Sequence, residues 1–219
     1  MNSVFSTIDN EIRKGAKTIV AVGDNDIFNQ VINAMAKIMS QNINAKNVPL
    51  GFIPIGKKNN DIACYLGLGL NEDACDVISA RRIKSFDLGV ANDHYFLTTA
   101  KITTKGTTVE IDKNYSIEIS EIGDVEVINM PVKSSLPEEI FSNPNDGVLE
   151  LYINTTNSNR FFSLSGNKQS PSVFSFKKLI ISNKQHKLTI DGSQQIKTPA
   201  EISIANEKIN LIIGKNRKF

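Results

Sequence analysis

The sequence has few cysteines, and their scarcity limits what the protein can be. Its 219 residues include two, Cys64 and Cys75, and their spacing is not that of metal ligands. Both fall in segments with helical periodicity. We therefore expect free structural thiols rather than a disulfide framework or a zinc site.

Long hydrophobic runs and a strong charge of either sign are also missing. No apolar run approaches the length of a membrane-spanning helix, and the N-terminus lacks the basic and then apolar pattern of a secretion signal. We therefore expect a cytoplasmic protein without a transmembrane segment. The net charge of +2 says little about partners, and we expect no nucleic-acid partner.

The stretch 49–68 contains a strand, a polar loop and the start of a helix. The apolar run 50–55 is too short for a helix and is broken by Pro54 and Gly56, which predicts a buried strand. Helical spacing begins at Ile62, and Asp61 is placed to cap that helix. The loop between them, here called the second loop (residues 56–61), suits phosphate because it combines a flexible backbone, cations and short polar side chains. Its residues are Gly56, Lys57, Lys58, Asn59, Asn60 and Asp61.

A similar passage lies upstream. The apolar run 18–22 leads into the first loop (residues 23–26: Gly23, Asp24, Asn25 and Asp26), and helical periodicity follows over 27–39. Two such passages in succession predict an α/β unit with a ligand crevice at the carboxyl ends of the strands. We therefore expect the first and second loops to lie side by side at one end of a parallel sheet.

Helical periodicity ends near residue 85, after two further helices expected over 4–14 and 72–80. From residue 95 onward, short runs in which apolar and polar residues alternate, the last at 209–214, predict an antiparallel sandwich. The predicted fold class is therefore α+β with two domains: a small α/β parallel-sheet domain of nucleotide-binding type (1–84), then a β-sandwich (85–219). The basic tail 215–219 is expected to be a solvated end, with a membrane-surface contact as the alternative.

Three segments together resemble the catalytic domain of diacylglycerol kinases and related lipid kinases, a fold shared with sphingosine kinases and more distantly with NAD kinases. The stretch 23–31 (GDNDIFNQV) corresponds to the family's Gly-Gly-Asp-Gly-Thr, hydrophobic residue, Asn-Glu-Val. Around the second loop, the family's Pro-x-Gly-Thr-Gly-Asn-Asp-x-Ala is matched by Pro54, Gly56, Asn60, Asp61 and Ala63, with one extra residue. The family's Asp-Gly-Glu is Asp191, Gly192 and Ser193 here, and the stretches 86–89 and 145–149 give further matches.

The resemblance implies ATP and Mg²⁺ as cofactors and a lipid hydroxyl at the membrane surface as the phosphoryl acceptor. It places Asp24 and Asp26 at the metal and Asp24, Asp191 and Ser193 at the catalytic centre. The implied cofactor-binding residues are Gly23, Asn25, Asp26, Asn29, Gly56, Lys57, Lys58, Asn60 and Asp61. Asp191 is expected to order a turn, and Ser193 replaces the glutamate that is the family's favoured general base.

These departures predict that phosphoryl transfer is weakened or lost. The alternatives are a non-catalytic pseudoenzyme that binds a nucleotide, a lipid or a protein, and an NAD-kinase-like enzyme. The first loop can also be a polar turn capped by its aspartates, and two alignments of residues 23–27 to the family's glycine loop stay open. The family's preceding strand and helix units are not in this sequence, so an open sheet edge and a homodimer are expected.

Overall fold

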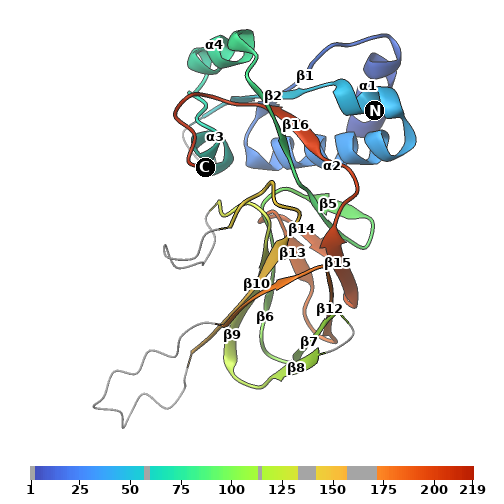
Figure 1. Cartoon of the computed structure of the whole chain (residues 1–219), viewed down its shortest axis with the longest axis vertical. Helices are drawn as coiled ribbons and strands as arrows, with labels where there is room; N and C mark the ends of the chain where they lie inside the picture. The colour runs from blue at the N-terminus through green and yellow to red at the C-terminus, as the bar shows by residue number, and fades with distance from the viewer. Residues whose placement is uncertain (1–2, 57–59, 113–114, 133–141, 157–171) are drawn as a thin grey trace.

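The protein folds as two lobes joined by two connecting segments. The computed structural model describes residues 3–56, 60–112, 115–132, 142–156 and 172–219. Figure 1 shows the helices gathered around a small sheet in the upper lobe, with a β-sandwich forming the lower lobe. None of the helices in the described ranges is long and apolar enough to cross a membrane.

The upper lobe is built on a four-stranded sheet in the order β1 (Ile19–Gly23), β2 (Leu50–Pro54), β16 (Ile209–Ile212) and β3 (Ile83–Phe86). β1, β2 and β16 run parallel, while β3 is antiparallel to β16. The helical elements are α1 (Val4–Arg13), α2 (Asn25–Gln41), the 3₁₀ helix η1 (Ile43–Asn47), α3 (Asp61–Tyr65) and α4 (Glu72–Ala80). The strands and helices expected in the first 80 residues are therefore confirmed.

The longest helix, α2, packs on this sheet through one apolar face. Phe28, Ile32, Met35 and Met39 recur at helical spacing and are almost completely buried. The ring of Phe28 stacks on that of Phe52 in β2, with centroids 4.3 Å apart and planes 16° from parallel. This contact fixes the start of α2 against the strand that leads into the second loop.

The lower lobe contains two six-stranded antiparallel sheets facing each other. The first has the order β11 (Ser172–Phe176), β10 (Leu149–Thr156), β9 (Ile122–Ile128), β6 (Thr99–Thr103), β13 (Leu188–Ile190), β14 (Gln194–Ile196). The second has the order β5 (His94–Phe96), β4 (Gly89–Ala91), β15 (Ala200–Ile204), β12 (Lys178–Asn183), β7 (Thr107–Ile111), β8 (Tyr115–Ile119). Alternate apolar residues of both sheets form one core between them. The expected two-domain fold class is confirmed.

Three expectations about smaller parts of the chain need correction. The last strand, β16, lies in the parallel sheet and not in the sandwich, because the chain returns to the upper lobe. The tail is a solvated end only over residues 215–218, which are exposed, whereas Phe219 packs against the core of the upper lobe. The N-cap residue of α3 is Asn60 rather than Asp61, and its side chain makes no capping hydrogen bond. The domain division at residue 84 stays a prediction.

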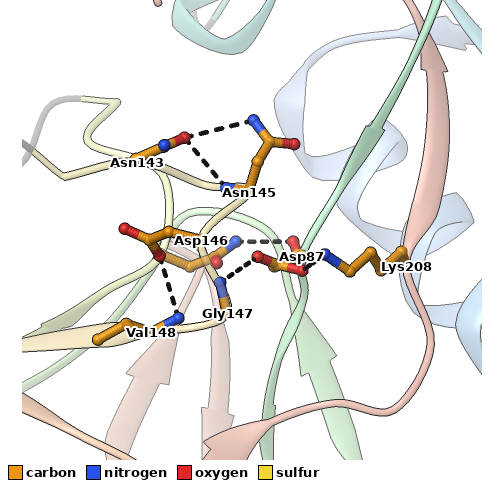
Figure 2. Close-up of polar contacts among 8 residues, drawn as sticks. Asp87, Asn143, Asn145, Asp146, Gly147, Val148 and Lys208 are labelled. Carbon is orange, nitrogen blue, oxygen red and sulfur yellow. Dashed lines mark hydrogen bonds and ion pairs between the residues drawn. The ribbon is translucent and has the colours of Figure 1, made fainter.

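The joint between the lobes has a buried aspartate at its centre (Figure 2). Asp87 is 1% exposed, and its carboxylate accepts a hydrogen bond from Gly147 N at 2.8 Å and pairs with Lys208 Nζ at 2.7 Å. Asn129 is buried nearby and donates through Nδ2 to the carbonyls of Asp87 and Leu97. Asp87 and Lys208 come from the two connecting segments, so this contact ties both connections to a single loop of the sandwich.

Candidate functional site

The first loop joins β1 to α2 through a glycine and a capping aspartate. Gly23 has φ +156°, and a Cβ at this position would lie 3.0 Å from the side chain of Ile27. Asp24 is the N-cap of α2: its Oδ1 accepts a hydrogen bond from Ile27 N at 3.1 Å, and its carbonyl accepts one from Phe28 N at 3.0 Å. The protein's own carboxylate therefore lies where a helix N-terminus would otherwise receive a phosphate.

The second loop lies directly beside the first. β1 and β2 are parallel with Gly23 opposite Pro54, and Ile55 N donates to Gly23 O at 2.8 Å. The expectation that the two loops share one end of the sheet is thus confirmed.

Within the second loop, one side chain closes the turn. Asn60 Nδ2 donates to Gly56 O at 2.7 Å, and Gly56 has φ +83° with open space where a Cβ would lie. Lys57 and Lys58, expected to bind phosphate, lie outside the described residues. The described backbone of this loop is therefore open on the side where Gly56 lacks a side chain.

A third segment, the turn after β13, reaches the same place from the sandwich. Asp191 has φ +48°, and its carboxylate accepts hydrogen bonds from Leu97 N (3.1 Å), Thr98 N (2.8 Å), Thr98 Oγ1 (2.6 Å) and Thr99 N (3.3 Å). The carbonyl of Asp191 accepts a longer bond from Asn29 Nδ2 of α2 at 3.4 Å. One residue thus joins α2 to the segment between β5 and β6.

The environment of Asp191 suits a positioning residue. Burial raises the pKa of its carboxyl, and the hydrogen bonds from Thr98, Leu97 and Thr99 oppose that rise. Both carboxylate oxygens are occupied by donors of the neighbouring segment. The carboxylate therefore has the contacts of a group that orders a turn, as expected from the sequence, rather than those of a proton acceptor open to a ligand.

These three segments line one cleft between the lobes, with a volume of about 890 Å³. Its upper wall comes from Asn25, Asp26 and Asn29 of α2 and Asp61 and Ile62 of α3, and the turn contributes Asp191, Gly192 and Ser193. The lower wall comes from the outer face of the first sandwich sheet and a neighbouring loop: Thr98, Thr99, Lys101, Ile102, Thr103, Asp124, Glu126, Val132, Gln185, His186, Lys187, Thr189 and Gln195. A smaller hollow of about 510 Å³ continues past Asp26, Asn29, Asp191 and Ser193.

The cleft is acidic among its described lining residues. Its described lining contains five acidic residues and two lysines, Lys101 and Lys187. The acidic residues are Asp26, Asp61, Asp124, Glu126 and Asp191. Lys101 Nζ pairs with Asp124 Oδ2 at 3.1 Å, so part of its charge is used within the wall. A polyphosphate would meet repulsion from these carboxylates unless a cation lies between them.

The described residues offer oxygen ligands for such a cation but no complete cage. They contain no group of three or more His, Cys, Asp or Glu residues that could hold a metal. Asp26 and Asn29 line the cleft side by side in the first turns of α2, and the buried Oδ1 of Asn29 has no hydrogen-bond partner among the described residues. Carboxylate and amide oxygens of this kind fit a hydrated Mg²⁺ that takes its remaining ligands from phosphate and water.

The structure brings six of the twelve sequence-predicted site residues to the cleft. Asn25, Asp26, Asn29, Asp61, Asp191 and Ser193 line the cleft, whereas Gly23 and Asp24 lie behind it at the start of α2 and Gly56 and Asn60 close the second loop. The lower wall was missed. Lys101, Asp124 and Glu126 are the outward residues of alternating strands, a pattern the sequence shows, but it does not show which strands border the cleft. His186 lines the lower wall too.

Comparisons with known proteins agree with this geometry. The family model of the diacylglycerol kinase catalytic domain matches residues 3–91. A crystal structure of a diacylglycerol kinase from Bacillus anthracis str. Sterne is 18% identical, with a TM-score of 0.73 over 97% of this chain and 81% of that chain. An NAD kinase from Archaeoglobus fulgidus in complex with ATP is 13% identical, with a TM-score of 0.60 over 99% of this chain and 83% of that chain. No curated protein matched the chain. At these identities the structural likeness shows a shared fold.

Proposed function

We propose, from the premise that this chain is a diacylglycerol kinase-like protein, that its cleft binds a phosphate-bearing nucleotide and that phosphoryl transfer to a lipid hydroxyl is weak or lost. The observation that carries this proposal is the meeting of the first loop, the second loop and the turn Asp191–Ser193 at one cleft. A cleft of this volume between two lobes is also a usual place for a small ligand.

The nucleotide would be held mainly from the second-loop side. Gly56 leaves its backbone open, and Lys57 and Lys58 of the same loop supply cations that can balance phosphate charge. The first loop contributes less, because Asp24 already caps α2. This arrangement supports nucleotide binding that depends on the second loop more than on the helix N-terminus.

Mg²⁺ would be held by Asp26 with Asn29 and would neutralise charge on the phosphates. Asp24 is the less suitable ligand, since one of its oxygens is engaged in the helix cap. ATP and Mg²⁺ stay part of the proposal.

Weak catalysis follows from the groups that face the cleft. Ser193 replaces the family's glutamate and cannot accept a proton unaided. Asp191, two residues before it, is occupied by four donors. Loss of a general base typically lowers the rate by about two to four orders of magnitude. A non-catalytic relative that binds a nucleotide, a lipid or a protein is therefore the second candidate function.

We also propose that the protein acts in the cytoplasm as a homodimer and meets its lipid at the membrane surface. Among the described strands, β1 has a neighbour on one side only. Val20 and Val22 of this strand are 39% and 50% exposed. An apolar edge strand of this kind favours pairing with a second chain.

Two measurements test the function. A thermal-shift panel with ATP, ADP, NAD and diacylglycerol, each with and without Mg²⁺, should show stabilisation by ATP or ADP, because a ligand that binds only the folded state raises the melting temperature. A radiolabel assay with diacylglycerol should show little or no product. Robust turnover that Asp24→Ala abolishes would show instead that the first loop is a rearranged active site, and the absence of any nucleotide shift would contradict nucleotide binding.

A further inference from the structure

We infer that residues 214–219 (the strap) position Asp61 and Ile62 in the cleft by holding the opposite end of α3. This inference rests on the proposed function, because these two residues line the proposed nucleotide cleft. Figure 1 shows the C-terminus beside α3.

α3 cannot keep its position through its own stability. It contains only five residues, and its N-cap residue, Asn60, makes no side-chain capping bond. Isolated helices shorter than about 12 residues are marginal in water even for favourable sequences. The position of α3, and with it that of Asp61 and Ile62 in the cleft, therefore depends on tertiary contacts.

Core contacts hold one side of this helix. Ile62, Ala63 and Leu66 are almost fully buried in the core of the upper lobe. The strap supplies contacts at its C-terminal end.

The backbone of the strap binds the carbonyls at that end. Gly214 N donates to Leu66 O at 2.9 Å, and Lys218 N donates to Tyr65 O at 3.0 Å. The last carbonyls of a helix have no partner within the helix, so these bonds satisfy groups that would otherwise need water. The approach is close: a Cβ on Gly67, which has φ +73°, would lie 2.6 Å from Arg217 N.

An aromatic contact also joins the strap to α3. The ring of Phe219 stacks on Tyr65 with centroids 5.5 Å apart and planes 22° from parallel, and it meets the edge of Phe86 at 5.2 Å and 82°. Lys84 Nζ lies 4.5 Å from the centre of the Phe219 ring. Tyr65 is 9% exposed, and burial raises the pKa of its hydroxyl. Phe219 therefore bridges α3 to β3.

The contact between Phe219 and Tyr65 lies close to the cleft. A five-residue helix is about 7.5 Å long, so Tyr65 and the cleft residue Asp61 are one turn apart. A displacement of the C-terminal end of α3 therefore moves Asp61 with it. This makes Phe219 a positioning residue, since it lies outside the residues that line the cleft.

The test uses the full chain with three variants. Phe219→Ala removes the ring contacts, Phe219→Tyr keeps them, and Ile111→Val lowers stability from the sandwich core, away from α3. Amide hydrogen exchange is measured for the N–H groups of Leu66, Gly67 and Leu68, and MgATP affinity is measured by calorimetry. For Phe219→Ala we expect exchange faster by about tenfold and MgATP affinity weaker by about fivefold to tenfold, as loss of an aromatic pair implies. Phe219→Tyr should keep both the exchange rate and the MgATP affinity at the wild-type level, and Ile111→Val should leave MgATP affinity unchanged.

The two readouts separate this inference from the proposed function. Unchanged exchange in Phe219→Ala overturns the strap whether or not MgATP binds. Faster exchange with unchanged MgATP affinity, or an equal loss of affinity in Ile111→Val, also overturns it. If the wild-type protein does not bind MgATP, the proposed nucleotide function fails, and the exchange of α3 alone then decides whether the strap holds this helix.

Discussion

The ion pair between Asp87 and Lys208 joins a buried residue to a half-exposed one. Asp87 is 1% exposed, whereas the side chain of Lys208 is 52% exposed. Removing the lysine leaves a buried carboxylate with Gly147 N as the remaining donor to its side chain among the described residues, and a buried charge without its partner is costly. We expect Lys208→Met to lower the free energy of unfolding by about 1–3 kcal/mol in urea titrations.

Lys178 provides the matched control for that substitution. Its Nζ lies 2.7 Å from Glu201 Oε1, the same separation as in the buried pair, but here both side chains are about half-exposed, at 41% and 51%. Exposed pairs contribute about 0–1 kcal/mol, so Lys178→Met should have little effect. Equal losses in the two variants would contradict the importance of burial at Asp87.

Glu150 is a second buried carboxylate, and its titration should be visible in the stability of the protein. It is 7% exposed and accepts a hydrogen bond from Ser142 Oγ at 2.6 Å. Burial raises the pKa of this carboxyl, the Ser142 bond opposes the rise, and the nearby Asp146 adds to it. A raised pKa in the folded state means that the contribution of Glu150 is fully present below its unfolded pKa and is lost as the pH rises through the folded value.

We therefore expect Glu150→Gln to remove this pH dependence. Glutamine keeps an oxygen for Ser142 and carries no charge. Urea unfolding should show the variant as stable as the wild type or more stable at about pH 8, and relatively less stable at about pH 4, where the wild-type carboxyl is protonated. Glu118→Gln, at an exposed position of β8, is the control. A variant that loses stability only at the higher pH would reverse the sign argued here.

The Asp24 carboxylate places a negative charge at the N-terminus of α2. Asp24→Asn keeps an oxygen that can accept from Ile27 N but removes the charge at the start of α2. The helix N-terminus then favours an added anion, so MgATP should bind about two- to fivefold more tightly, measured by calorimetry.

Asp24→Ala separates the cap from the charge. This variant should lose about 1 kcal/mol of unfolding free energy because the capping bond is gone. Loss of MgATP binding in Asp24→Asn would show instead that the Asp24 carboxylate holds the metal.

The elements of the upper lobe were predictable because their signals are local. The helical periodicity over 27–39 and the short apolar runs at 18–22 and 50–55 correspond to α2, β1 and β2. Local periodicity did not predict which sheet the last strand joins. Its residues Ile209, Leu211, Ile212 and Ile213 form a nearly continuous apolar run, as in strands buried on both faces of a parallel sheet. This run distinguishes β16 from the alternating strands of the sandwich, but it does not identify the strand beside which β16 lies.

The location of the candidate site could be predicted from the sequence, whereas the contacts of its side chains could not. Parallel strands end at one edge of a sheet, so two strand-to-helix passages place their loops together. The resemblance to the family's Asp-Gly-Glu also predicted a turn at Asp191, and Asp191 lies in a turn. That its carboxylate bonds to residues 97–99, almost a hundred positions earlier in the chain, depends on tertiary structure that no local pattern contains.

At the scale of the whole molecule, the exposed edge of the small sheet predicts the state of assembly. Val20 and Val22 of β1 are exposed, and so are Ile27 and Ile55, which lie beside Gly23 at the end of this strand. Pairing of β1 with a second copy would satisfy its free backbone groups and cover this apolar surface. We expect light scattering to give twice the mass of one chain at micromolar concentration. Val22→Lys should yield monomers, because a charged side chain on an edge strand opposes pairing. Ile43→Lys, a change at an exposed residue of η1, should leave the dimer intact. A wild-type monomer, or a Val22→Lys variant that still dimerises, would contradict an interface at β1.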